Sequence, residues 1–123
     1  MKARIERTLS DKEFYDIFIT MVSLNYPKER RLTPREKEIV IEFMGLGKKF
    51  EHNRFSRQAR KIIRDRFGIT QLNMNNLLMS IKKKGYLAVD NDDITIFSPM
   101  LSNIIGKGEL ELTFNFKVNY DEV

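Results

Sequence analysis

The sequence predicts a small α+β fold in which helices come first and strands last. Apolar residues recur every three to four positions between residues 11 and 84, the period of an amphipathic helix, and every second position from residue 86 onward, the period of a strand. A serine or threonine that can cap free helical amides precedes each helical stretch. With 123 residues, 41% of them hydrophobic, the chain is long enough for one domain with a buried core.

The first helix is expected from residue 11 to about residue 24. Ser10 and Glu13 can form a capping box, in which each side chain bonds the backbone amide of the other residue. Pro27 lies just beyond the expected end, and proline cannot continue the helical hydrogen bonding. Residues 2–9 alternate loosely and are expected to form a short strand or an extended arm. The residues expected on the buried face of this helix are Phe14, Ile17, Phe18 and Met21.

Three further helices are expected, each beginning after a capping residue and ending at a glycine. Thr33 opens the first of them with a second capping box, Ser56 opens the next, and Thr70 opens the last. Residues 59–84 therefore read as helix, glycine turn and capped helix, which is the helix-turn-helix arrangement. The residues expected to be buried are Ile39, Val40, Phe43, Met44, Ala59, Ile62, Ile63, Phe67, Met74, Leu77, Leu78 and Ile81.

Beyond Gly85 the pattern changes to strands. Residues 86–89 and 94–97 read as a β-hairpin joined by the polar turn 90–93, and residues 98–105 as a short helical turn. A long strand is expected over residues 109–119, where apolar and polar residues alternate throughout. Because such an amphipathic edge is an aggregation hazard if unpaired, we expect it to pair with another chain, either a second copy or another protein. The apolar face of this strand consists of Leu110, Leu112, Phe114, Phe116 and Val118.

The positive charge is concentrated on the predicted helix-turn-helix. Residues 48–84 hold eleven Lys and Arg against two acidic residues, a net of +9, whereas residues 1–47 carry +1 and residues 85–123 carry −5. A basic helix pair is the electrostatic footprint of a protein that binds a phosphate backbone. The alternative is a solvated charged face without a nucleic-acid partner.

The composition argues against several other classes of protein. The chain has no cysteine, which excludes disulfides and thiolate chemistry, and its single histidine, His52, gives little support to a zinc site or to histidine-based catalysis. The aspartates of the 90–93 turn lack the glycine and the bidentate glutamate of a calcium loop, and no phosphate-binding glycine loop is present. We therefore expect no enzyme, metal, cofactor or small-molecule substrate. Without a membrane span or a signal peptide, we expect a cytoplasmic protein, or one within a particle assembled in the cell.

Two stretches resemble known DNA-binding families. FGITQLNMNNLLMSIKKKGYL, residues 67–87, is similar to the turn, recognition helix and wing opening of the winged helix-turn-helix superfamily. LTPREKEIV, residues 32–40, resembles the start of the LuxR-type helix-turn-helix domain, but the spacer GLGKKFEHNRFS and the hairpin depart from that family. The winged-helix resemblance implies a core over residues 32–98, preceded by an arm and helix over residues 1–31 and followed by a strand extension over residues 99–123.

The same resemblance implies a protein that binds double-stranded DNA, such as a small transcriptional or replication regulator acting as an oligomer. Asn and Gln side chains can pair with adenine edges, and a threonine at a helix start can bond a phosphate. Arginines and lysines would supply charge to the backbone. The residues that it implies as DNA contacts are Arg54, Arg57, Arg60, Arg64, Thr70, Gln71, Asn73, Asn75, Asn76, Ser80, Lys82, Lys83 and Lys84.

Two features favour an alternative function. Leu72 and Met79 project opposite the buried stripe of the last helix, where exposed apolar side chains suit a protein partner. The acidic 90–93 turn would be repelled by phosphates. The alternative is a non-enzymatic structural or assembly subunit, for instance of a phage particle or nucleoprotein complex. It would use the same fold and the 109–119 strand for protein–protein contacts.

Overall fold

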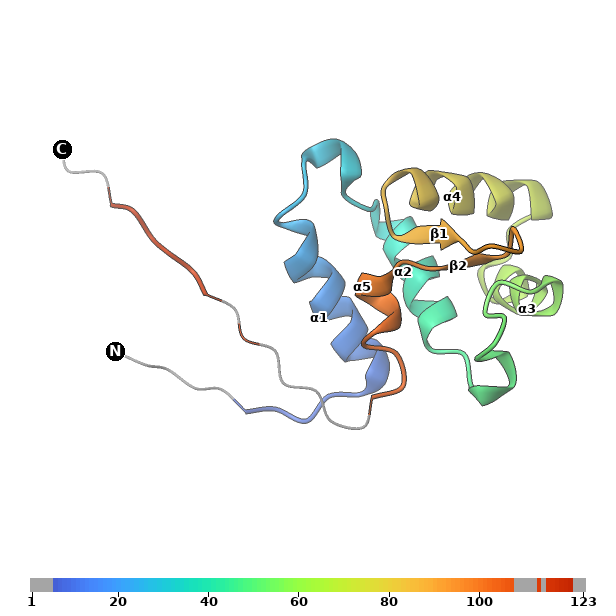
Figure 1. Cartoon of the computed structure of the whole chain (residues 1–123), viewed down its shortest axis with the longest axis horizontal. Helices are drawn as coiled ribbons and strands as arrows, with labels where there is room; N and C mark the ends of the chain where they lie inside the picture. The colour runs from blue at the N-terminus through green and yellow to red at the C-terminus, as the bar shows by residue number, and fades with distance from the viewer. Residues whose placement is uncertain (1–5, 108–112, 114, 121–123) are drawn as a thin grey trace.

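The computed structural model describes residues 6–107, 113 and 115–120, and it is a small α+β structure (Figure 1). Four main helices are followed by a two-stranded antiparallel hairpin near the C-terminus, as the sequence predicts. Single 3-10 turns occur at Lys28–Arg30 and Lys48–Phe50. The remaining elements are α1 (Asp11–Ser23), α2 (Pro34–Met44), α3 (Arg57–Phe67), α4 (Gln71–Lys83), β1 (Leu87–Val89), β2 (Thr95–Phe97) and α5 (Pro99–Ser102).

All four predicted helix caps are confirmed. The side-chain oxygens of Ser10, Thr33, Ser56 and Thr70 each accept a hydrogen bond from the backbone amide three residues on. In α1 and α2 the capping box is closed, because a glutamate at the third helical position bonds back to the amide of the capping residue. Local side-chain chemistry thus determines where these helices begin.

Two glycines follow helices α3 and α4 in backbone conformations that other residues rarely adopt. Gly68 ends α3 with φ +63° and ψ +35°, so that only Ile69 separates it from the cap of α4. Gly85 follows α4 with φ +94°. A Cβ at that position would lie 2.6 Å from an Nη atom of Arg30, so the end of that flexible side chain would have to shift as well.

The hairpin is held by its own turn as well as by its strands. Leu87 pairs with Phe97 and Val89 with Thr95. In the turn, the Asp90 carboxylate accepts hydrogen bonds from the amides of residues 92 and 94, at 2.8 and 3.0 Å. The turn therefore owes its shape to an aspartate rather than to a glycine.

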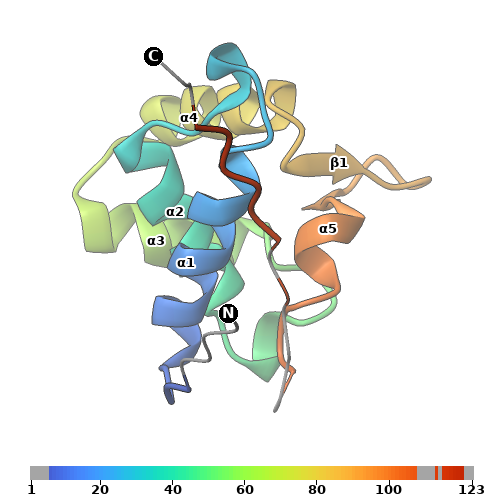
Figure 2. The ribbon, with the colours of Figure 1, turned by 90° about the vertical axis from the view of Figure 1, so that its left-hand side faces the viewer.

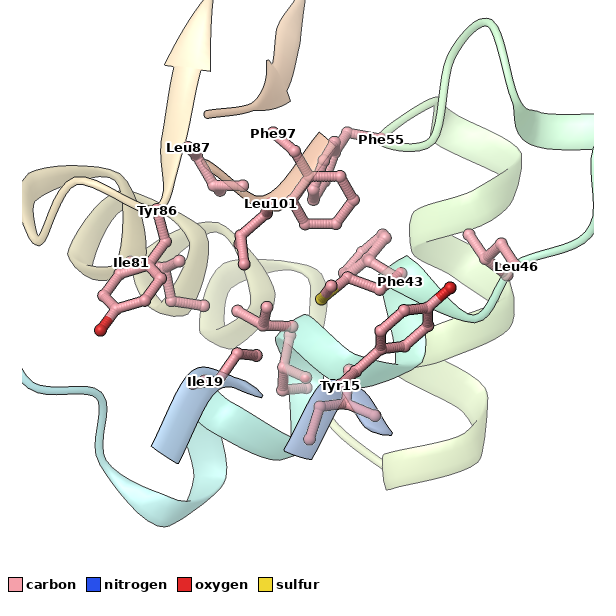
Figure 3. Close-up of a cluster of buried hydrophobic side chains, with 14 of the residues drawn as sticks. Tyr15, Ile19, Phe43, Leu46, Phe55, Ile81, Tyr86, Leu87, Phe97 and Leu101 are labelled. Atoms are coloured by element: carbon pink, nitrogen blue, oxygen red, sulfur yellow. The ribbon is translucent and has the colours of Figure 1, made fainter. Parts of the chain in front are cut away.

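The hydrophobic core lies between the helices and one face of the hairpin (Figure 3). Phe55, from the loop before α3, stacks on Phe43 of α2 and makes an edge contact with Phe97 of β2, with ring centroids 4.6 and 4.8 Å apart. Leu101 of α5 is fully buried beside them. Helices and hairpin are thus joined through aromatic side chains at the centre.

The expected buried face of α1 is wrong in part. Ile17 is 46% exposed, whereas Tyr15 and Ile19 are buried together with Phe18. The helix is turned toward α2 and α5, and the Tyr15 hydroxyl accepts a hydrogen bond from the Gly106 amide at 3.3 Å. That partner allows a polar side chain to replace an apolar one in the core.

The predicted strand over residues 109–119 is not formed in the part of it that the structure describes. Residue 113 and residues 115–119 carry no strand assignment, and among the described residues the sheet consists of β1 and β2. Phe116 and Val118 are 69% and 66% exposed, and residues 115–120 run apart from the helices on the α1 side (Figures 1 and 2). Leu110, Leu112 and Phe114 lie outside the described residues. Pairing of this segment with another chain stays a prediction.

At the other end, residues 6–9 have no regular structure, and the rest of the predicted arm lies outside the described residues. Among the helices of the described part of the chain, none combines the length and the apolar character needed to cross a membrane.

Candidate nucleic-acid interface

Three arginines of α3 share one helical face and border a hollow next to α4. Arg57, Arg60 and Arg64 recur at the helical spacing that places residues on one side. Together with Gln71 and Asn75 of α4 they line a hollow of about 160 Å³. The turn at Gly68 sets this arrangement, because it brings the first turn of α4 against the basic face of α3.

These three arginines have no acidic partner among the described residues. Arg66, two residues further along α3, lies on the opposite face, where it forms an ion pair of 2.8 Å with Glu42. The Nε atom of Arg60 is buried without a hydrogen-bond partner. Glu42 therefore pairs with a cation on the other face of α3, whereas Arg57, Arg60 and Arg64 have no ion pair among the described residues.

The hairpin tip lies beside the same arginines. A second hollow, of about 290 Å³, is lined by Arg57 and Arg60 on one side and by Asp93 and Thr95 on the other. No ion pair joins the two sides among the described residues. The positive face of α3 thus ends at an acidic border.

The outward face of α4 is exposed as the sequence predicts. Leu72 is 67% and Met79 58% exposed, which places two apolar side chains at the centre of this face. Lysine charge is added toward the C-terminal end of the helix. The polar residues of α4 that are exposed are Gln71, Asn73, Asn75, Asn76, Lys82 and Lys83.

A third hollow lies between α4 and the start of α2. It has a volume of about 500 Å³ and is lined by Asn73 and Asn76 of α4 together with Thr33 and Arg35 at the start of α2. The predicted amides therefore divide between two sides of the helix. Gln71 and Asn75 lie toward the arginines of α3, and Asn73 and Asn76 lie toward α2.

Ser80 and Lys84 are engaged inside the protein rather than free at its surface. Both bond the carboxylate of Glu36, which is 2% exposed: the Ser80 hydroxyl donates to Oε2 and the Lys84 ammonium to Oε1, each at 2.5 Å. Burial by itself raises the pKa of the Glu36 carboxyl, but the hydrogen bonds from Lys84, Ser80 and the Thr33 amide hold it below its ordinary value. The pair ties the start of α2 to the end of α4.

Arg54 is likewise engaged within the fold. Its guanidinium donates to the carbonyl oxygens of Met44 and Leu46, at 3.3 and 2.7 Å, where α2 ends. These are carbonyls that the helix cannot satisfy itself. Thr70 has a structural task too, since its hydroxyl oxygen caps α4, but its hydroxyl hydrogen is free to donate.

Glu36 is the residue of this region that the sequence patterns did not single out beyond its place in a capping box. Its partners in α4 lie 44 and 48 residues away, so no local spacing indicates the contact. An indirect signal was present, because α4 has no acidic residue of its own to pair with its C-terminal lysines.

Comparisons with protein-family models, with curated proteins and with solved structures found no match to this chain. What the interface binds therefore has to follow from its charge, its shape and its hydrogen-bonding groups.

Proposed function

We propose that this protein is a winged-helix DNA-binding protein that binds duplex DNA through α3 and α4, as a small transcriptional or replication regulator. The observation that carries the proposal is the set of unpaired arginines, Arg57, Arg60 and Arg64, beside the exposed amides of Gln71 and Asn75. Free cations that adjoin hydrogen-bonding amides on one surface suit a polyanion with readable edges.

The arrangement assigns different tasks to the two helices. In helix-turn-helix proteins the second helix enters the major groove while the first crosses the backbone. Here α4 would present Asn75, Asn76 and Gln71 to base edges, and the arginines of α3 would bond phosphates. Lys82 and Lys83 would contact the backbone at the other end of α4. Arg54, Ser80 and Lys84 are left out of this surface because their charges and hydroxyl already have partners in the fold.

The test is a binding titration with random-sequence duplex DNA over a range of salt concentrations. A protein that neutralises several phosphates loses affinity steeply, with a slope of log K against log salt of about −0.9 per phosphate. We expect a slope that corresponds to several phosphate contacts. A slope near zero, or no binding at low salt, would overturn the proposal.

A second candidate function is a structural or assembly subunit that binds proteins through the same helices. The exposure of Leu72 and Met79 at the centre of the outward face of α4 favours it, because exposed apolar pairs on a surface helix suit a protein partner. In a DNA complex the same side chains would have to meet thymine methyl groups. Adding charge at Met79 separates the two functions, because a cation favours contact with DNA and disfavours an apolar protein contact.

A further inference from the structure

The free edge of β2 opens onto a large hollow that no arginine of α3 lines. In the hairpin, the Ser98 amide donates to the Tyr86 carbonyl and the Asp90 amide to the Ile94 carbonyl. Bonded and outward-facing residues alternate along an antiparallel pair. The amides and carbonyls of Thr95 and Phe97 therefore point away from β1, at the free edge.

The hollow beside this edge combines apolar side chains, which a strand with one apolar face can contact, with charged ones such as Glu51 and Arg54. Its volume is about 730 Å³, and Thr95, Ile96 and Phe97 of β2 form one wall. Its apolar lining includes Leu46 and Phe55, which Figure 3 shows with Phe97. Backbone groups at an open sheet edge next to apolar side chains are the two requirements for adding a strand to a sheet.

The C-terminal segment of the same chain has the matching pattern. In residues 115–120 the apolar side chains of Phe116, Val118 and Tyr120 alternate with polar ones, and all three are mostly exposed. Ile105 and Gly106 line the hollow, so the tail leaves the protein at its rim. Residues 115–120 nevertheless lie on the α1 side, apart from their own β2 (Figure 1). The occupant that fits is the tail of a second copy.

We propose that residues 115–120 of one copy add as a strand to the free edge of β2 in a second copy, with Phe116, Val118 and Tyr120 toward the hollow. Two such exchanges related by a twofold axis would close a symmetric dimer. Thr95 borders both this hollow and the one beside Arg57 and Arg60, but no arginine of α3 lines the receiving hollow, so the inference does not depend on DNA binding.

The experiment measures the mass of the full chain by sedimentation at rising concentration. The parent should be a dimer. A tail variant, Phe116→Asp with Val118→Asp, should be a monomer, because carboxylates would replace the apolar side chains that pack against Leu46, Phe55 and Phe97. Its matched control, Asn115→Asp with Asn119→Asp, adds the same charge on the polar side of the strand and should remain a dimer. A parent that stays monomeric at all concentrations would overturn the proposal.

The receiving edge is tested with proline. Thr95→Pro removes an outward amide without breaking a bond to β1, and it should abolish the dimer. Val89→Pro removes the equivalent outward amide of β1, at the opposite edge, and should leave the dimer intact; circular dichroism checks that both variants fold.

Mixing provides a third readout that does not depend on either variant alone. The tail variant has an unaltered β2 edge, and Thr95→Pro has an unaltered tail. The two monomers together should therefore form a heterodimer in which the tail of Thr95→Pro binds the β2 edge of the tail variant. If Thr95→Pro remained a dimer, or if the two folded monomers did not associate on mixing, the tail would not bind at the free edge of β2. If Thr95→Pro does not fold, the tail variant and its control still decide whether the tail makes the dimer.

Discussion

The ammonium group of Lys84, at the end of α4, bonds the carboxylate of Glu36, in the first turn of α2, although 48 residues separate them. The contact is mostly buried, since 17% of the Lys84 side chain and 3% of the Glu36 side chain are exposed. It holds the C-terminal end of α4 against the N-terminal end of α2.

The first prediction separates Lys84 from its neighbour Lys83. Lys84→Ala leaves a buried carboxylate without its cation, which costs about 3–5 kcal/mol of unfolding free energy for a buried pair. Lys83→Ala removes an exposed ammonium without an ion pair among the described residues, and unfolding stability should change little. Urea unfolding at neutral pH measures both. Equal stability of the two variants would contradict the structural role of Lys84.

The second prediction concerns pH. Because the pKa of Glu36 in the folded protein lies below its ordinary value of 4.5, the ionised group contributes stability above that pH. The contribution is lost as the pH falls through the folded-state pKa. Glu36→Gln should therefore lower stability at pH 7 and make it less dependent on pH below about 4.5.

The matched control for Glu36→Gln is Glu13→Gln, which changes the equivalent capping-box residue of α1 at an exposed position. It should alter both stability and its pH dependence less. Unfolding curves at several pH values measure the difference, and identical pH profiles for the two variants would count against the buried pair as the cause.

The third prediction compares two arginines of α3. Arg64→Ala should weaken binding to all duplex sequences alike and reduce the salt slope by about 0.9, the value for one phosphate contact. Arg66→Ala removes the same charge from the opposite face, where Arg66 shares the Glu42 carboxylate with Lys12, and the slope should change less. Arg57→Ala and Arg60→Ala should add to the effect of Arg64→Ala. Equal slopes for the two single variants would mean that the charge of α3 acts without regard to its face.

The fourth prediction uses Met79 to distinguish the two proposed functions. Met79→Lys adds a cation at the centre of the outward face of α4. A DNA-binding surface should gain nonspecific affinity, with a slope steeper by about 0.9, whereas a protein-binding surface should lose its partner. Ile17→Lys adds the same charge at an exposed apolar position of α1 and should change neither property. If Met79→Lys behaves like Ile17→Lys in both assays, this face of α4 serves neither function.

The fifth prediction concerns Arg54. Arg54→Met keeps much of the side chain but leaves the carbonyls at the end of α2 without their charged donor, which should cost about 1.5–3 kcal/mol. Lys49→Met, at an exposed position of the same loop, is the control and should change stability by much less. Thermal unfolding measures both. A full loss of DNA affinity in folded Arg54→Met would show that Arg54 contacts the ligand after all.

The elements of the fold could be predicted because their signals are local. Ser10, Thr33, Ser56 and Thr70 lie within three residues of the amides that they cap, and the periodicity of the apolar residues marks each helix. The face of α1 could not be predicted as well. The residues that α1 buries contact partners far away in the sequence, such as Gly106, whose amide bonds the Tyr15 hydroxyl 91 residues away.

The candidate site likewise has features that local sequence patterns predict and features that depend on distant residues. Spacing along α3 indicated which arginines share a face, and the helical projection indicated that Leu72 and Met79 are exposed. Which cations remain free depends on acidic partners elsewhere in the chain. Glu42 neutralises Arg66 and Glu36 holds Lys84, and neither contact leaves a pattern in the sequence.

The hairpin tip has a consequence for how any polyanion would approach. Asp93 borders the same hollow as Arg57 and Arg60, so attraction and repulsion act on opposite sides of a short stretch of surface. A charge pair of this kind exerts a torque on an approaching phosphate chain and favours one orientation before contact is made. The acidic turn would thereby act on the geometry of the encounter and on its rate, in a way that fades as added salt shortens the range of both fields.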